Sequence, residues 1–250
     1  MKYKYNELFA RNELLLGKQA VDTISTKRVI LFGVGGVGSW CAESLIRSGI
    51  QNLTLVDPDD VALSNINRQL PATVETIGQP KAEVLKARLL SINPDAKIEV
   101  IARIYSADTA DSFRLESYDY IIDAIDSLKD KAHLLINASK TEATVFSSMG
   151  AALKIDSEKI RVAEFWNVKG CKLASALRNR FRHDEKPRKK IMCVYSEERL
   201  ENKGIDYFIN PDAASSLNNK RANGTMVHIT AIFGFTLAGL TIRDIVEKSE

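Results

Sequence analysis

The sequence is poor in the residues that mark disulfide-rich, fibrous or disordered chains. Only three of its 250 residues are cysteine, Cys41, Cys171 and Cys193, and no pair has CxxC spacing. Three cysteines cannot form a disulfide framework or a four-thiolate zinc site, so we expect a reducing compartment and no zinc. With only 13 glycines and six prolines, the chain is neither collagen-like nor of low complexity.

Long apolar runs are also scarce. The N-terminus has no apolar segment followed by a small-residue cleavage site, so we expect no signal peptide. The longest apolar stretch, 226–240, has 15 residues and is interrupted by polar and glycine residues. Because roughly 20 residues are needed to span a bilayer, we interpret it as a buried helix. We expect a cytoplasmic protein and leave open a peripheral membrane association of this helix.

The composition is that of a folded globular protein. Hydrophobic residues make up 45% of the chain and charged residues 27%, which disfavours disorder. A chain of this length buries roughly 70–75% of its unfolded surface, so its core needs no cross-links. Because no stretch resembles a linker, we predict a single domain over residues 1–250. Within it we distinguish a regular part, 28–150, from a less regular C-terminal part, 151–250.

Charge is nearly balanced overall but uneven along the chain. The net charge of +3 comes from 35 basic and 32 acidic residues. Residues 178–190, RNRFRHDEKPRKK, hold seven Lys or Arg residues against Asp184 and Glu185, so this window carries +5 and the rest of the chain −2. A basic patch on a near-neutral body favours an anionic polymer as partner.

Short β-rich runs alternate with helical stretches from residue 28 to residue 149. We expect strands at 28–32, 53–56, 97–101, 120–123 and 144–149, and helices at about 37–48, 81–92 and 128–139. This alternation predicts an α/β fold with a Rossmann-like, mostly parallel sheet flanked by helices. The last third is less regular, with strands expected at 159–165 and 192–196, helices at 171–182 and about 225–246, and a loop at 197–223.

A glycine-rich motif follows the first expected strand. The run Gly33-Val34-Gly35-Gly36-Val37-Gly38 matches G-x-G-x-x-G between a strand and a helix. Such glycines allow a tight turn and a close approach of phosphate to the backbone, and the helix N-terminus supplies free N–H groups. Asp57 ends the second strand 19 residues after Gly38, where a carboxylate can bind ribose hydroxyls. The alternatives are a glycine turn without a ligand and an Asp that caps a turn.

The residues beyond Asp57 favour ATP over a nicotinamide dinucleotide. Asn65 and Arg68 follow the second strand, and Lys81 begins the next helix. Two cations directed at one phosphate region fit a triphosphate better than a pyrophosphate. Asp123 and Asp126 follow the fourth strand and are candidate ligands of Mg²⁺. Asp126 could instead, or in addition, cap the helix that begins near residue 128.

The run GVGGVGSW…LVDPDDVALSNINRQ…GQPKAE…DAIDS resembles the ThiF–MoeB–HesA branch of the ubiquitin-activating-enzyme-like superfamily, whose members adenylate a carboxylate with ATP and Mg²⁺. The resemblance implies that Asp126 holds the metal and that Arg11, in FARNELLLG, is contributed to the partner's ATP site in a homodimer. From spacing alone, Arg11 would be a solvated helix charge. The resemblance also implies that 28–150 is the nucleotide-binding core and that 151–250 supplies substrate-binding and dimer elements. The implied catalytic residues are Arg11, Arg68, Lys81 and Asp126. The implied nucleotide-binding residues are Gly33, Gly35, Gly36, Gly38, Asp57, Asp59, Asn65, Arg68, Lys81 and Asp126.

Over the whole chain, FARNELLLG, YIIDAIDSLKDKAHLL, the basic stretch before CVYSEE and NGTMVHITAIFGF resemble the tRNA threonylcarbamoyladenosine dehydratases. That resemblance implies adenylation of the threonine carboxylate of a modified tRNA nucleoside, followed by intramolecular ring closure. Because proximity supplies the rate of such a closure, no enzyme nucleophile is needed. Cys193, within a β-rich run, is accordingly interpreted as a buried, inert thiol. An accessory sulfur-transfer or redox protein stays open as a partner.

The basic stretch fits a tRNA substrate because cations contact phosphates without reading sequence. Phe181 and His183 lie between these cations and could stack on an unpaired base. The alternative is a solvated loop. The candidate tRNA contacts are Lys172, Arg178, Arg180, Arg182, Lys186, Arg188, Lys189 and Lys190.

Three other functions compete with this interpretation. A sulfur-carrier adenylyltransferase would share the ATP site, but many such enzymes carry two CxxC pairs that are absent here. An NAD-dependent dehydrogenase would need a catalytic His or Lys in the second half and no NINRQ, Lys and Asp constellation. A non-catalytic RNA-binding module would not need Arg11, Arg68, Lys81 and Asp126 together.

Overall fold

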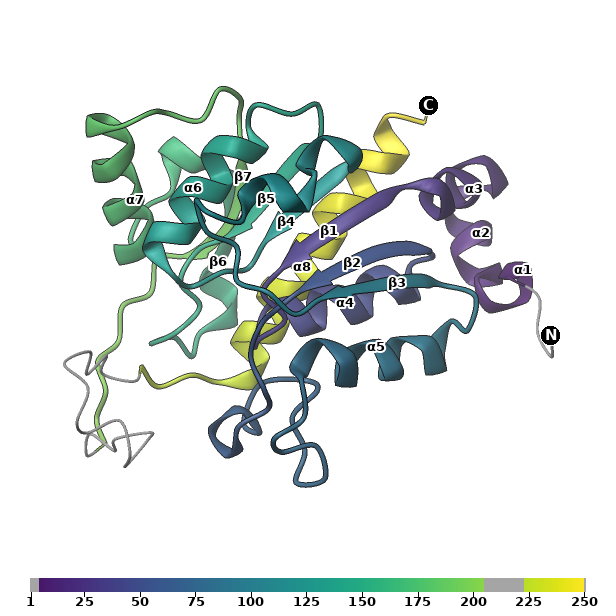
Figure 1. The fold of residues 1–250 in the computed structure, drawn as a ribbon, viewed down its shortest axis with the longest axis horizontal. Coiled ribbons are helices and arrows are strands. Elements are labelled where there is room, and N and C mark those ends of the chain that lie inside the picture. The colour runs from purple at the N-terminus through teal and green to yellow at the C-terminus, as the bar shows by residue number, and fades with distance from the viewer. Residues whose placement is uncertain (1–4, 205–222, 250) are drawn as a thin grey trace.

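The computed structural model describes residues 5–204 and 223–249, and its centre is one seven-stranded sheet (Figure 1). The strand order is β3 (Lys97–Ile101), β2 (Asn52–Val56), β1 (Arg28–Phe32), β4 (Tyr120–Asp123), β5 (Thr144–Ser148), β7 (Met192–Ser196) and β6 (Ile160–Glu164). Neighbouring strands are parallel except for β6, which is antiparallel to β7. The expected mostly parallel α/β sheet is therefore confirmed.

Helices cover both faces of the sheet (Figure 1). One face carries α4 (Gly38–Arg47), α5 (Lys81–Ile92) and α8 (Val227–Glu247), and the other carries α6 (Leu128–Ala138) and α7 (Lys172–His183). Before β1, the chain forms α1 (Tyr5–Leu8), α2 (Ala10–Leu16) and α3 (Lys18–Thr26), which lie beside the amino ends of the strands. Single turns of 3₁₀-helix occur at Leu63–Asn65, Ala110–Phe113, Leu115–Ser117, Ser157–Lys159 and Phe165–Asn167.

Alternation along the strands divides the core into two layers. In β1, Val29 and Leu31 pack in the layer beneath α4, α5 and α8, whereas Ile30 and Phe32 pack beneath α6 and α7. Side chains of successive strand residues point to opposite faces, so a strand with helices on both sides is apolar at nearly every position. The run RVILF meets this requirement with four fully buried residues after Arg28.

The expected elements differ from the observed ones mainly at their ends. One helix and four strands have the expected bounds: the helix at 81–92 and the strands at 28–32, 97–101, 120–123 and 192–196. The last helix runs from Val227 to Glu247, within one or two residues of the expected 225–246. Of the loop expected at 197–223, residues 205–222 lie outside the described residues.

Helix α8 packs closely on α4. At Gly234, an added Cβ would lie 2.4 Å from the carbonyl oxygen of Val37 and 2.8 Å from the backbone nitrogen of Cys41. The two helix backbones therefore approach each other at a distance that only glycine permits. Among the described residues, α8 is the one helix long and apolar enough to cross a membrane, and 56% of its apolar window is buried within this chain.

Candidate functional site

The glycine turn between β1 and α4 has a backbone that only glycine can adopt. Gly33 has a φ of +84°, and a Cβ added there would lie 2.8 Å from the carbonyl oxygen of Ala124. At Gly38 an added Cβ would lie only 1.8 Å from the carbonyl oxygen of Gly33. By contrast, nothing lies closer than 3.6 Å to an added Cβ at Gly35. Gly33 and Gly38 thus close the turn, and Gly35 leaves room beside the N-terminus of α4 for a ligand.

Asp57 ties the end of β2 to this turn. Its carboxylate accepts hydrogen bonds from the backbone N–H of Val34 at 2.8 Å and of Asp59 at 2.9 Å. The residue is 7% exposed, and this burial raises the pKa of Asp57, although the two N–H groups and the charge of Lys81 oppose the shift. The carboxylate expected to bind a ribose therefore lies at the glycine turn.

Lys81 and Asp59 form an ion pair next to Asp57. The Nζ of Lys81 lies 2.8 Å from Asp59 Oδ2, and the backbone N–H of Lys81 donates to the carbonyl of Asp59 at 3.0 Å. The Lys81 side chain is 7% exposed and that of Asp59 is 65% exposed. These contacts hold Lys81, the first residue of α5, near the carboxyl end of β2. Its expected role beside phosphates stays a prediction.

Asn65 and Arg68 shape the loop after β2. Asn65 is buried, and its Oδ1 accepts from the N–H of Ala62 at 3.0 Å, so its oxygen serves the turn itself. Arg68 donates to the carbonyl of Ser64 at 2.9 Å, and its Cγ lies 3.3 Å from an added Cβ at Gly36. Burial lowers the pKa of Arg68, and the Asp126 carboxylate opposes that shift. Arg68 therefore lies beside the glycine turn, within the electrostatic influence of Asp126.

The two acidic residues after β4 have different environments. Asp123 is fully buried, with its carboxylate 2.7 Å from Lys131 Nζ and accepting from Ser147 Oγ at 2.6 Å. It is therefore unavailable as a metal ligand, and that part of the sequence-based interpretation is wrong. Asp126 is exposed. The N-cap of α6 is Ser127, whose Oγ donates to Asp130 at 2.8 Å, so the alternative of Asp126 as this cap is not supported.

The basic stretch contains two kinds of cation. Arg178 donates to the carbonyls of Phe165 and Val168, at 3.3 and 2.8 Å, and Lys189 donates to the carbonyls of Thr141 and Ala143. These two side chains join α7 and the following loop to neighbouring segments. Within the described chain, no acidic side chain pairs with four exposed cations: Lys172, Arg182, Lys186 and Lys190.

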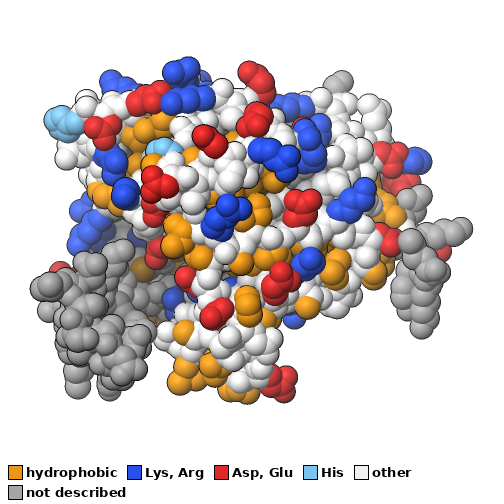
Figure 2. Space-filling view, viewed as in Figure 1, with side chains coloured by type: hydrophobic (Ala, Val, Ile, Leu, Met, Phe, Trp, Pro, Cys, Tyr) orange, Lys and Arg blue, Asp and Glu red, His pale blue; other side chains and the backbone are white. Residues whose placement is uncertain are grey.

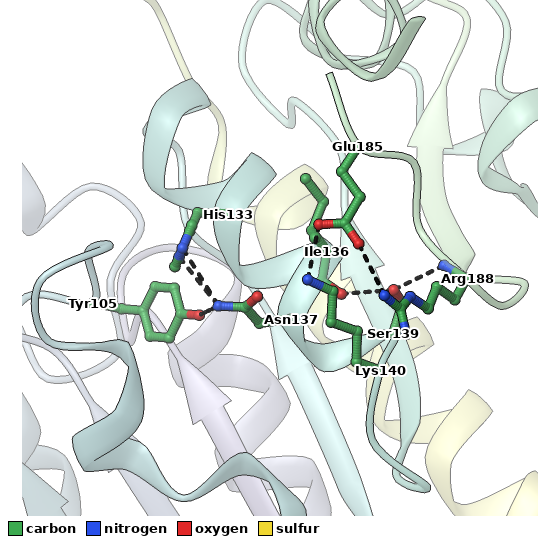
Figure 3. Close-up of polar contacts among 8 residues, drawn as sticks. All are labelled: Tyr105, His133, Ile136, Asn137, Ser139, Lys140, Glu185 and Arg188. Atoms are coloured by element: carbon green, nitrogen blue, oxygen red, sulfur yellow. Dashed lines mark hydrogen bonds and ion pairs between the residues drawn. The ribbon is translucent and has the colours of Figure 1, made fainter. Parts of the chain in front are cut away.

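The loop after α7 is attached to the end of α6, as Figure 3 shows. The backbone N–H of Arg188 donates to Ser139 Oγ at 2.9 Å. The Glu185 carboxylate pairs with Lys140 at 2.8 Å and with Arg188 at 3.5 Å. Farther along α6, Asn137 donates to the hydroxyl of Tyr105 at 3.2 Å. The contacts of Glu185 and Arg188 with Ser139 and Lys140 hold the basic loop against the end of α6.

Comparison with known proteins places the chain in a family. The ThiF family profile matches residues 9–248. The chain belongs to the ThiF family. It is 33% identical to the tRNA threonylcarbamoyladenosine dehydratase of Bacillus subtilis, over 97% of this chain and 96% of that protein.

A solved structure agrees over the same extent. The crystal structure of Escherichia coli tRNA N6-threonylcarbamoyladenosine dehydratase in complex with ATP matches with a TM-score of 0.85 and 30% identity, covering 98% of this chain and 96% of that chain. The molybdopterin-synthase adenylyltransferase of Escherichia coli is 31% identical, but over 55% of this chain and 54% of that protein. The similarity to the dehydratases thus includes the last third, and the similarity to this adenylyltransferase does not span the chain.

Within this ThiF-family chain, Arg11 does not lie at its own glycine turn. It is an exposed residue of α2, and the hydroxyl of Tyr5 in α1 donates to the carbonyl of Gly49, beyond the C-terminus of α4. The N-terminal helices are therefore at the amino ends of the strands, whereas the glycine turn is at the carboxyl end of β1 (Figure 1). The five residues of β1 alone separate these ends by about 16 Å.

Sequence reasoning overlooked Gln69 and misjudged Phe181. The buried Oε1 of Gln69 has no hydrogen-bond partner, and its Nε2 lies 3.6 Å from an added Cβ at Gly35. Its place in NINRQ, directly after Arg68, was the available signal.

Phe181 is fully buried with its ring centroid 5.4 Å from that of Phe165, so the expectation that it stacks on a base is wrong. His183 is exposed.

The cysteines of this ThiF-family chain are buried. Cys193 has no exposed surface, and its thiol lies 3.6 Å from the carbonyl oxygen of Ile191. Burial raises the pKa of Cys193 far above its ordinary value, and the same holds for Cys41. The expected burial of Cys193 is confirmed, and its inertness stays a prediction. Among the described residues, no three His, Cys, Asp or Glu side chains are grouped so that they could hold a metal ion.

Proposed function

We propose that this protein is an ATP-dependent tRNA threonylcarbamoyladenosine dehydratase. The observation that carries the proposal is the similarity over nearly the whole chain to proteins of that name, one of them solved with ATP. The alternative, an adenylyltransferase for a sulfur-carrier protein, has similarity over about half of the chain to support it. The extent of similarity, nearly the whole chain against about half of it, therefore favours the dehydratase.

The proposed reaction has two steps. An oxygen of the threonine carboxylate attacks the α-phosphorus of ATP, and the bond to pyrophosphate breaks to leave an acyl-adenylate. A nucleophilic atom of the threonylcarbamoyl group then attacks the acyl carbon, the bond to AMP breaks and a proton is lost. The nucleoside has lost one water in total. Intramolecular attack explains why a chain with buried cysteines can carry out the reaction.

The described residues suit the binding of ATP. Asp57 would accept hydrogen bonds from the ribose hydroxyls, and Gly35 leaves space for a phosphate beside α4. Arg68 and Lys81 would stabilise the negative charge of the phosphates, and Asn65 would hold their loop. The unpaired amide of Gln69 adjoins the same space. Asp59 would contribute to the nucleotide site through Lys81, because its carboxylate pairs with the Lys81 side chain.

The donor groups also fit Mg²⁺ together with a triphosphate. Mg²⁺ typically keeps several waters and takes one or two carboxylates plus the phosphates of the nucleotide. The exposed Asp126, near Arg68, supplies one carboxylate, which agrees with the lack of a larger acidic cluster among the described residues. When bound, the metal would neutralise phosphate charge. Asp126 would hold it beside the glycine turn.

We propose that tRNA binds across α7 and the loop that follows it. The exposed cations without acidic partners among the described residues, Lys172, Arg182, Lys186 and Lys190, would contact phosphates. Arg180 and Arg188 could exchange their weak surface pairs with Asp184 and Glu185 for phosphates. Arg178 and Lys189 would instead hold the surface in shape, because their donors are used by carbonyls.

A homodimer would place Arg11 in the partner's ATP site. Next to Arg11 on α2, Leu14 and Leu15 are 86% and 82% exposed. Apolar side chains also gather at the lower end of the molecule in Figure 2, where the β2–α5 loop lies; Leu63 and Val74 of this loop are exposed. A two-fold dimer that pairs α2 of one protomer with this loop of the other would cover both surfaces and bring Arg11 near the partner's Arg68.

Other partners and the cellular location rest on the sequence. We expect a cytoplasmic enzyme, because its substrate is tRNA, with a sulfur-transfer or redox accessory protein as an open partner. Peripheral membrane association of α8 is less favoured, since more than half of its apolar window packs within the chain.

The test of the proposed function is ATP–pyrophosphate exchange with three acceptors side by side. Exchange is expected with tRNA that carries threonylcarbamoyladenosine, and not with unmodified tRNA or with a sulfur-carrier protein ending in Gly-Gly. Mass spectrometry of the digested tRNA should show loss of 18 Da from the modified nucleoside, the mass of water. Exchange only with the Gly-Gly protein would establish the alternative function.

A further inference from the structure

A fully buried ion pair lies beside the loop that carries Asp126. Lys131, in the first turn of α6, and Asp123, at the end of β4, have side chains without exposed surface, and Lys131 Nζ lies 2.7 Å from Asp123 Oδ2. Ser147 of β5 donates to the same oxygen at 2.6 Å. Removing two charges from water costs several kcal/mol per ion, so apolar side chains of similar volume would often stabilise a core at least as well.

Both partners of this pair hold the same peptide segment. Asp123 Oδ1 accepts from the backbone N–H of Ile125 at 3.1 Å, and Lys131 Nζ donates to the carbonyl of Ile125 at 2.8 Å. Ile125 directly precedes Asp126. The ion pair therefore restrains both the N–H and the carbonyl of Ile125, the residue before Asp126.

The same segment touches the glycine turn on its other side. The N–H of Ala124 donates to the carbonyl of Phe32 at 2.8 Å. The carbonyl oxygen of Ala124 is the atom that would lie 2.8 Å from a Cβ on Gly33. Residues 124 and 125 are thus clamped between the buried ion pair and the turn, so a change in the pair would move Asp126 relative to the glycine turn.

We propose that Lys131 and Asp123 are positioning residues for the metal–nucleotide site: their buried pair holds the Ile125 peptide and so sets where Asp126 meets the metal on ATP. This inference rests on the proposed role of Asp126. Groups that orient a metal ligand typically change metal affinity or activity by 10–100-fold when they are removed. The pair acts through Asp126 and touches neither metal nor substrate.

The test measures the dissociation constant of ATP by calorimetry twice, once with Mg²⁺ and once with EDTA. The constant in EDTA divided by the constant with Mg²⁺ is the metal-dependent part of the affinity. Lys131→Met should reduce this ratio about tenfold or more while changing the affinity in EDTA less. Asp126→Asn should bring the ratio close to one. The double variant Asp123→Asn/Lys131→Met leaves no unpaired buried charge and is expected to fold and to show the same reduced ratio.

Glu43→Gln is the matched control, because Glu43 is also a buried carboxylate in ion pairs, with Arg47 and Arg88, but at the contact between α4 and α5. It should lower the melting temperature and keep the wild-type ratio. If the double variant folds and keeps that ratio while Asp126→Asn loses it, the positioning role is wrong and the metal role of Asp126 stands. If Asp126→Asn keeps the ratio, the metal role itself is wrong. A double variant that does not fold would assign the pair to stability alone and overturn the proposal.

Discussion

The carboxylate of Asp57, at the end of β2, accepts a hydrogen bond of 2.8 Å from the backbone N–H of Val34 in the glycine turn. One residue thus joins the two segments that are proposed to bind the nucleotide: the glycine turn, which would face the phosphates, and the end of β2, which would face the ribose. Burial raises the pKa of this carboxylate, and the two backbone donors oppose the shift.

Replacing Asp57 should weaken nucleotide binding. Asp57→Ala is expected to cost about 1.5–3 kcal/mol of ATP binding, because it removes a charged hydrogen-bond acceptor for the ribose. Asp57→Asn keeps an acceptor for Val34 and should lose less. Calorimetry with ATP and NAD measures both variants. Micromolar binding of NAD to the wild type, without binding of ATP, would contradict the assignment of the site.

The proposed homodimer, with Arg11 in the partner's ATP site, predicts complementation between two inactive variants. Arg11→Ala and Asp126→Ala should each be nearly inactive, since a cation that stabilises charge on transferring phosphates can be worth roughly a thousand-fold in rate. Mixed dimers contain one site with both wild-type residues and should regain part of the activity. Exchange of subunits is verified with differently tagged protomers. Verified exchange without recovery would remove Arg11 from the partner's site.

The basic surface predicts a change in the salt dependence of tRNA binding. Replacing Lys172, Arg182, Lys186 and Lys190 with Gln should weaken tRNA binding and flatten the plot of log affinity against log salt, by roughly 0.7–0.9 per lost phosphate contact. ATP affinity should hardly change, because the glycine turn is at another part of the sheet.

The variants Arg178→Gln and Lys189→Gln distinguish cations that stabilise the fold from cations that contact tRNA phosphates. Both should lower the melting temperature, because Phe165, Val168, Thr141 and Ala143 would lose donors for their carbonyls. Each should change the salt slope less than a substitution of Lys186. An unchanged slope in the fourfold variant would mean that the patch only keeps the protein soluble.

The ion pairs of Glu43 predict that part of the free energy of unfolding depends on pH in the acid range. Burial opposes ionisation, but the hydrogen bonds and charges of Arg88 and Arg47 lower the pKa of Glu43 below its ordinary value of 4.5. Because the folded pKa is the lower one, this stabilisation is present above about pH 4.5 and is lost as the pH falls through the folded value. Urea unfolding of wild type and Glu43→Gln should therefore differ most at neutral pH and converge in acid. A constant difference would contradict the pairing.

Local rules predicted much of the fold from the sequence. The bounds of β1, β3, β4 and β7 follow from short β-rich runs, and α5 ends at Asn93-Pro94, where proline cannot continue a helix. The glycine turn and Asp57 were recognisable because the motif and the strand end are adjacent in a βαβ unit. The bounds of α8 were also predictable to within one or two residues, because its long apolar stretch is helical from Val227 onwards.

The sequence by itself determined the strand–helix alternation, the G-x-G-x-x-G turn and the chemical character of the residues around it, because these depend on neighbours within about one βαβ unit. Only the tertiary structure decided which residues of each type are exposed and able to bind a ligand. Asp123 is buried by Lys131 and Ser147 while Asp126 is exposed, and Phe181 packs on Phe165. Lys189 serves carbonyls at Thr141 and Ala143. The physical reason is that burial and hydrogen-bond partners come from segments far apart in sequence, which no local pattern encodes.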